Sequence, residues 1–189
     1  MNETLTNIDK LRGIALDQHG FVTTAQALEE GVTHAALSML VKRGRLERSA
    51  HGVYRVPQVP ATAVDALMLA VLWTADPAAA LGHETALDAY GVSDVNPTKI
   101  HVVVPKARRI RRSVPPDYAL HREDVDPTDL TWWEQMPIVS LRKAVEQCID
   151  GGLPDYLVRQ AVERGARTGQ LVGEEPQELM KRLEARHAR

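Results

Sequence analysis

The sequence predicts an α+β protein, in which an N-terminal module of three helices and a β-hairpin precedes a mixed α/β domain with a small sheet and C-terminal helices. Two observations predict this class. Apolar residues recur at helical spacing toward both ends of the chain, whereas a β-branched run at residues 99–105 predicts a strand between them. Pro57 and Pro60 bracket a short connection. We therefore expect one domain at 1–57 and a second at 61–189.

The N-terminal module begins with a helix expected at about residues 5–18. The apolar side chains that share one face of it are Leu5, Ile8, Leu11, Ile14 and Ala15. A second, short helix is expected at 24–30 and ends at Gly31. A third helix is expected to begin at a Thr33 cap and to end near Arg43.

Two short strands are expected on either side of a tight turn at residues 50–52. Helices followed by such a hairpin form a winged helix-turn-helix, a module whose recognition helix fits the major groove of DNA. Because a helix in the groove presents its N-terminal side chains to base edges, we expect Thr33, His34 and Ser38 to contact bases. Thr33 is equally consistent with a role as an N-cap alone.

Basic residues follow at the end of this helix and in the hairpin. The candidate contacts to phosphates or to the minor groove are Lys42, Arg43, Arg45, Arg48, His51 and Arg55. Phosphate contacts fix the register of a protein on the duplex without selecting a sequence. The alternative is that these side chains are solvated at a helix end and on a strand, and that His51 is only a turn residue.

The charge of the chain is arranged in blocks. A formal net charge of −2 excludes a uniformly basic coat for nucleic acid. A second basic run lies between two expected strands and contains Lys106, Arg108, Arg109, Arg111 and Arg112. Such a block is typical of a surface that binds nucleic acid or an acidic partner protein, and it is also consistent with a solvated loop.

The second domain is expected to combine strands at 99–105 and 118–122 with helices. The expected helices are 61–74, 83–90, 140–149, 154–168 and 176–188. Between the sheet and the last helices stand Trp132 and Trp133. They cannot both face the same way if the segment is extended, and we expect at least one of them to pack in a core.

Signals for catalysis are weak. The segment 82–87, GHETAL, contains half of a zinc-protease motif, but Leu87 stands where the second histidine would be. The seven histidines show no ligand spacing, and no Cys-x-x-Cys is present, so we expect no metal and no cofactor. The strand at 99–105 carries no acidic residue of the kind that a nuclease needs. The sequence therefore predicts a protein that is not an enzyme.

The N-terminus lacks the basic start and apolar run of a signal peptide. The longest apolar run, residues 66–73, is too short to span a bilayer. The single cysteine, Cys148, cannot form an internal disulfide, which favours a reducing compartment. We expect a soluble, cytoplasmic protein.

Four stretches in order resemble the AbiEi-type antitoxins of bacterial abortive-infection (type IV) toxin–antitoxin systems. They are the winged helix ending at 52–55, residues 81–92, the strand 100–105 with its basic loop and the strand ending at 121–122, and residues 136–144. The resemblance implies a transcriptional repressor that binds double-stranded DNA at repeats in its own promoter. It also implies that the C-terminal domain counters a cognate nucleotidyltransferase-like toxin, with or without direct contact.

Two alternatives remain open at this point. One is a ligand-sensing transcriptional repressor with a C-terminal effector and dimerisation domain. The other is an enzyme that processes nucleic acid with a winged helix as its guide. The acid-poor strand at 99–105 argues against the enzyme.

Overall fold

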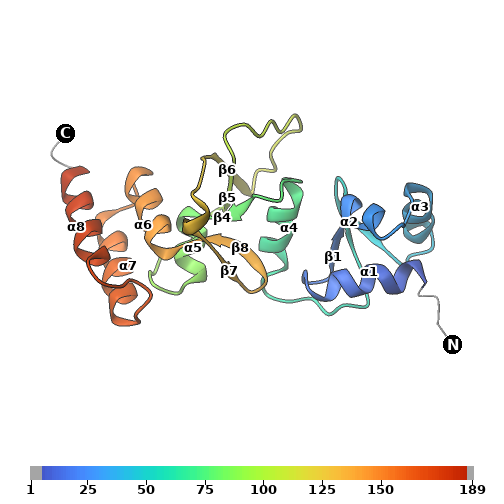
Figure 1. Ribbon diagram of the computed structural model, residues 1–189, viewed down its shortest axis with the longest axis horizontal. Coiled ribbons are helices and arrows are strands. Elements are labelled where there is room, and N and C mark those ends of the chain that lie inside the picture. Colours follow the sequence, from blue (N-terminus) through green and yellow to red (C-terminus); the bar gives the residue numbers. More distant parts are fainter. Residues whose placement is uncertain (1–5, 187–189) are drawn as a thin grey trace. The chain divides into compact units, whose positions relative to one another are not determined.

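The chain folds into two units, Met1–Pro77 and Ala78–Arg189, and the computed structural model describes residues 6–186 (Figure 1). The α+β class predicted from the sequence is confirmed. The sequence placed the domain boundary near Pro57 and Pro60, whereas the structure divides the chain after the helix expected at 61–74. That helix contacts the three strands of the first unit, and it therefore groups with them.

The first unit follows the predicted order of helices and hairpin. Its elements are α1 (Asn7–Leu16), β1 (Phe21–Thr23), α2 (Thr24–Glu29), α3 (His34–Lys42), β2 (Glu47–Ala50), β3 (Val53–Arg55) and α4 (Asp65–Trp73). Threonines fix where the first three helices begin, because Thr6, Thr23 and Thr33 each accept a hydrogen bond from a backbone N–H in the first turn. Leu5, which the sequence placed in the first helix, lies outside the described residues.

The sheet of the first unit has the order β1-β3-β2, and both pairs are antiparallel. Helices and sheet bury one apolar core, made of Ile8, Leu11, Ala15, Val22, Ala27, Val32, Leu37, Leu46, Val56 and Val59. Strand β1 was not predicted, since three residues are too few to show an alternating pattern. It continues the sheet of the hairpin and places the start of α2 against the wing.

The second unit is built around a five-stranded mixed sheet. Its elements are β4 (Ala80–Leu81), α5 (His83–Ala89), β5 (Ile100–Val104), β6 (Tyr118–Arg122), the 3-10 turn η1 (Pro127–Asp129), β7 (Leu130–Trp133), β8 (Met136–Val139), α6 (Leu141–Asp150), α7 (Asp155–Arg167) and α8 (Glu175–Arg186). The order of the strands is β6-β5-β4-β8-β7. β5 and β6 run parallel, and the long basic segment forms the connection between them.

Helices α6, α7 and α8 pack against one another at the C-terminal end of this unit (Figure 1). Ser140 caps α6, as expected. The helix predicted at 176–188 is α8, whose last two predicted residues lie outside the described part of the chain. Among residues 6–186, none of the helices has both the length and the apolar character that a membrane crossing requires.

The structure shows the surroundings of two tryptophans and of the single cysteine in this unit. Trp132 and Trp133 lie in β7 and point to opposite sides, so Trp132 is 71% exposed while Trp133 is half-buried. Cys148 is buried in α6, and burial raises the pKa of its thiol. This thiol is therefore a packing group rather than a reactive one.

Candidate nucleic-acid interface

Helix α3 has a buried side and an exposed side, and the exposed side carries the predicted base contacts. Leu37 is buried in the core of the first unit. His34, Ser38 and Lys42 are all exposed and stand four residues apart, so they form one line along the helix. Thr33 is also exposed, and its hydroxyl accepts a hydrogen bond from the Ala36 N–H at 3.2 Å.

The basic residues after α3 extend this polar surface. Lys42, Arg43, Arg45 and Arg48 are exposed, and none of them forms an ion pair with another described residue. Positive side chains of this kind at the end of a recognition helix can reach the phosphates that flank the groove.

The wing is held against the second helix rather than free. The turn between β2 and β3 contains His51, which is exposed, and Gly52, which has a φ of 72°. The Gly52 carbonyl accepts hydrogen bonds from the Thr24 N–H at 2.8 Å and from the Thr24 hydroxyl at 3.3 Å. These bonds fix the position of His51 relative to α2. Glycine suits position 52 because its backbone is left-handed.

Arg55 was predicted to contact DNA, and the structure gives its guanidinium a different role. Its side chain is 16% exposed and forms an ion pair with Asp65 at 2.6 Å. It also donates to the backbone carbonyls of His19 and Val59, and it lies over the ring of Phe21. With its donors committed to the start of α4, Arg55 is not placed to reach a duplex.

The partly buried pair of Arg55 and Asp65 is expected to contribute to stability. Partial burial raises the pKa of the Asp65 carboxyl, but hydrogen bonds from Thr62 and Arg55 outweigh it and hold this pKa below its ordinary value. We expect Asp65→Ala to lower the free energy of unfolding by about 1–3 kcal/mol at neutral pH, as for a hydrogen-bonded charge. Because the folded pKa is lowered, this contribution is complete above the unfolded pKa and disappears as the pH falls through the folded pKa.

Urea denaturation of wild type and Asp65→Ala, at neutral pH and in acid, measures this effect. The difference between the two proteins should be largest at neutral pH and should shrink in acid. Asp117→Ala, an exposed carboxylate in the second unit, is the matched control. A difference that does not depend on pH would contradict an ionic role for Asp65.

The second basic run forms the loop between β5 and β6, which extends away from the sheet (Figure 1). Lys106, Arg109 and Arg111 are exposed, whereas Arg108 and Arg112 are half-buried. The Lys106 N–H donates to the Asp124 carboxylate at 3.0 Å, which fixes the start of the loop. The exposed members therefore remain candidates for binding a partner.

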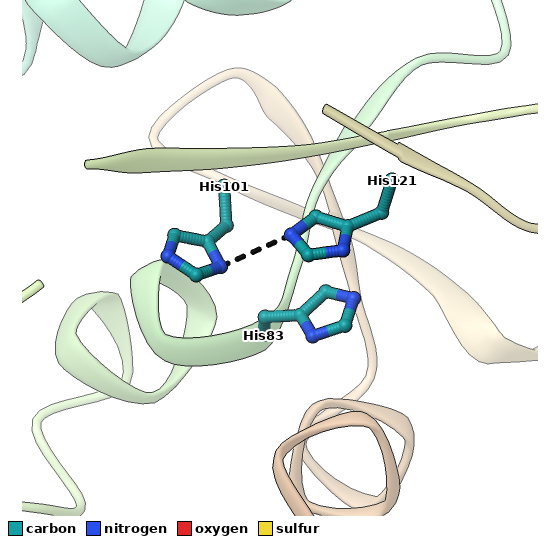
Figure 2. A group of neighbouring side chains, drawn as sticks. All are labelled: His83, His101 and His121. Atoms are coloured by element: carbon teal, nitrogen blue, oxygen red, sulfur yellow. Dashed lines mark hydrogen bonds between the residues drawn. The ribbon is translucent and has the colours of Figure 1, made fainter. Parts of the chain in front are cut away.

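The structure brings together three histidines that lie far apart in the sequence. His83 is the first residue of α5, His101 lies in β5 and His121 lies in β6. Figure 2 shows the three rings gathered at one place, with the two strand histidines joined by a hydrogen bond between His101 Nδ1 and His121 Nε2 at 3.2 Å. The ring of His83 stacks on that of His121, with 3.6 Å between the centroids.

Strand register explains why the two strand histidines meet. β5 and β6 are parallel, and Val103 stands opposite His121. His101, two residues before Val103, points to the same face of the sheet and is the diagonal neighbour of His121. Helix α5 packs against β5 and adds His83 to the pair.

A polar network holds His83 in place. Its backbone is left-handed, with a φ of 51°, and its N–H donates to Gln147 Oε1 at 2.9 Å. Gln147 in turn donates to Glu123, which forms an ion pair with Lys143 at 2.6 Å. A Cβ at Gly82 would stand 2.6 Å from Val103 Cγ2 and 2.9 Å from Gln147 Oε1, so a larger residue there would displace these side chains.

Burial keeps these imidazoles neutral. It is the main cause of a lowered pKa at His83, His101 and His121. The pKa of His83 falls to about 3, because the charged forms of the other two rings add to the effect of burial. Neutral imidazoles each offer a lone pair, which is the form that binds metal ions.

No local motif in the sequence points to this cluster. The expectation that the histidines show no ligand spacing is correct for local motifs such as H-x-x-x-H, but it missed residues that β-pairing brings together. The nearest signal was the position of His101 and His121 in two strands predicted to be partners. Their register, and the packing of α5, could not be read from the sequence.

A known protein family matches most of the first unit. Residues 9–57 match the family of AbiEi antitoxin transcriptional regulators. No curated protein matches the chain. A solved structure, the RV2827C protein from Mycobacterium tuberculosis, is similar with 16% sequence identity and a TM-score of 0.44, covering 95% of this chain and 82% of that one. The resemblance stated from the sequence is thus confirmed over residues 9–57.

Proposed function

We propose, from the match of residues 9–57 to the AbiEi antitoxin transcriptional regulators, that this chain is a DNA-binding antitoxin that represses its own toxin–antitoxin operon. The observation that carries the proposal is the exposed side of α3. His34 and Ser38 lie in one line on it, and basic side chains that form no ion pair with another residue of 6–186 follow at its end. This is the pattern of a recognition helix, with base contacts at its start and phosphate contacts at its end.

The second half of the proposal concerns the second unit. It counteracts a cognate nucleotidyltransferase-like toxin, and it acts by binding rather than by catalysis. The exposed residues of the β5–β6 loop, Lys106, Arg109 and Arg111, are the surface we assign to a partner. An acidic protein surface or a nucleic acid would complement them.

A ligand-sensing repressor finds less support in this unit. A cavity of about 120 Å³ is lined by Ala78, Ala80, Val103, Pro105, Glu123, Asp124, Val125 and Leu130. Pockets for small molecules usually occupy about 300–1,000 Å³. This cavity is smaller than that range. We retain the antitoxin as the proposed function because the matched family is one of antitoxin transcriptional regulators.

A gel-shift titration with the DNA upstream of the gene tests the regulatory half. We expect binding at low salt that weakens steeply as salt rises, with a shuffled sequence of the same length bound less tightly. Co-expression with the neighbouring open reading frame tests the other half, and rescue of growth is the expected result. Absence of binding to the upstream DNA at low salt would refute the repressor, and absence of rescue would refute the antitoxin.

A further inference from the structure

We propose that His83, His101 and His121 form a binding site for one Zn²⁺ ion, with the fourth coordination position left to a water molecule. The site lies within the second unit and is independent of the proposed DNA contacts. Its three ligands come from α5, β5 and β6, so a bound ion would connect the helix to both strands (Figure 2). Those two strands also carry the basic loop.

The spacing of the nitrogens suits a tetrahedral ion. Two imidazole nitrogens on one tetrahedral Zn²⁺ lie about 3.3 Å apart, because each Zn–N bond is about 2.0–2.1 Å long. His101 Nδ1 and His121 Nε2 are 3.2 Å apart. One of these two nitrogens carries the proton of their hydrogen bond, and this proton moves to the other nitrogen of the same ring when both bind the ion. The candidate ligand atoms of all three residues lie within 4.8 Å of one another. Rotation of side chains alone can close the remaining distance of roughly 1.5 Å.

An unsatisfied atom points to a missing partner. The Nε2 of His83 is buried and has no hydrogen-bond partner within the described part of the chain. Buried polar atoms without partners are rare in folded proteins, and each requires an explanation. The hydrogen bond between His101 and His121 leaves this nitrogen without a partner, and an ion bound to it would satisfy it.

The chemistry of the ligands favours zinc over harder cations. Imidazole nitrogen suits Zn²⁺, whereas Mg²⁺ and Ca²⁺ require oxygen ligands. The nearby carboxylate of Glu123 is already engaged by Lys143 and Gln147. A set of three histidines with one open position is a known arrangement for zinc in proteins.

Zinc titration of the full chain tests the site. Protein treated with EDTA and then freed of the chelator is titrated with ZnCl₂ in a calorimeter, and we expect one ion per chain. The melting temperature should rise when zinc is added and fall again with EDTA, because the ion binds the folded state. Co²⁺ in place of Zn²⁺ should give the intense visible absorption of a tetrahedral site rather than the weak spectrum of the hydrated ion.

Two variants remove single ligands. We expect His101→Asn and His121→Asn each to lower the zinc affinity at least about 100-fold, since loss of a ligand should cost no less than loss of its supporting partners. Their melting temperatures should no longer respond to zinc. His34→Ala, which removes an exposed imidazole from the first unit, is the matched control and should still bind one ion per chain.

Circular dichroism establishes whether these variants are folded. If they are not, the wild-type protein still decides the question through its Co²⁺ spectrum. The site is refuted if wild type takes up no more zinc than the ligand variants, or if Co²⁺ bound to wild type keeps the spectrum of the hydrated ion. Failure of DNA binding would not affect this result, because none of the three histidines lies in the first unit.

Discussion

The triple variant Lys42→Ala/Arg43→Ala/Arg45→Ala is expected to bind its promoter DNA several hundred-fold more weakly than wild type at about 0.1 M salt. Each phosphate contact contributes roughly 0.9 to the slope of log affinity against log salt, which corresponds to about an eightfold loss at that concentration. Three contacts give a slope lower by about 2.7. Gel-shift or fluorescence-anisotropy titrations at several salt concentrations measure both quantities.

A control variant with the same change in net charge distinguishes a loss of affinity caused by the local contacts from one caused by the overall charge. Lys99→Ala/Arg167→Ala/Lys181→Ala removes three exposed basic residues from the second unit. It should keep a slope close to that of wild type, because its charges are not part of the proposed interface. If both triple variants lost affinity equally, the effect would come from net charge and the proposed contacts at the end of α3 would be wrong.

The largest expected loss of stability is at Leu37, on the buried side of the same helix. Leu37 is 1% exposed and packs in the core of the first unit. Leu37→Ala should lower the free energy of unfolding by about 2–5 kcal/mol, because it removes buried methyl groups and leaves a cavity. Urea denaturation followed by circular dichroism measures this loss.

The adjacent residue provides the control. Ser38 is exposed, so Ser38→Ala should change the free energy of unfolding by no more than about 0.5 kcal/mol. The same substitution should reduce the preference for promoter DNA over a shuffled sequence, because Ser38 lies in line with His34. A large loss of stability in Ser38→Ala would show that this side of α3 is packed rather than available to DNA.

Much of the first unit could be predicted because its signals are local. A threonine before each of the first three helices satisfies backbone groups of the first turn, and this effect depends only on residues within that turn. Helical spacing likewise assigns Leu37 to the core and Ser38 to the surface without knowledge of the fold. The sequence also placed the strands of the wing correctly on either side of its turn.

Arg55 is a residue whose role the local sequence did not predict. In the sequence it is one more basic residue in a basic segment. Its role is decided by Asp65, which a helix beyond the predicted domain boundary brings within 2.6 Å. Position in the chain therefore did not distinguish this paired arginine from its neighbours, which form no ion pair within the described residues.

By itself, the sequence determined the α+β class, the winged helix and the exposed polar side of α3, because capping and periodicity act over a few neighbouring residues. The tertiary structure alone decided the order and direction of the strands in the second unit. It also decided the ion pair of Arg55 with Asp65 and the clustering of His83, His101 and His121. These depend on which distant segments pair and in what register. A shift of one residue between β5 and β6 would turn His121 to the opposite face of the sheet, and no local pattern fixes that register.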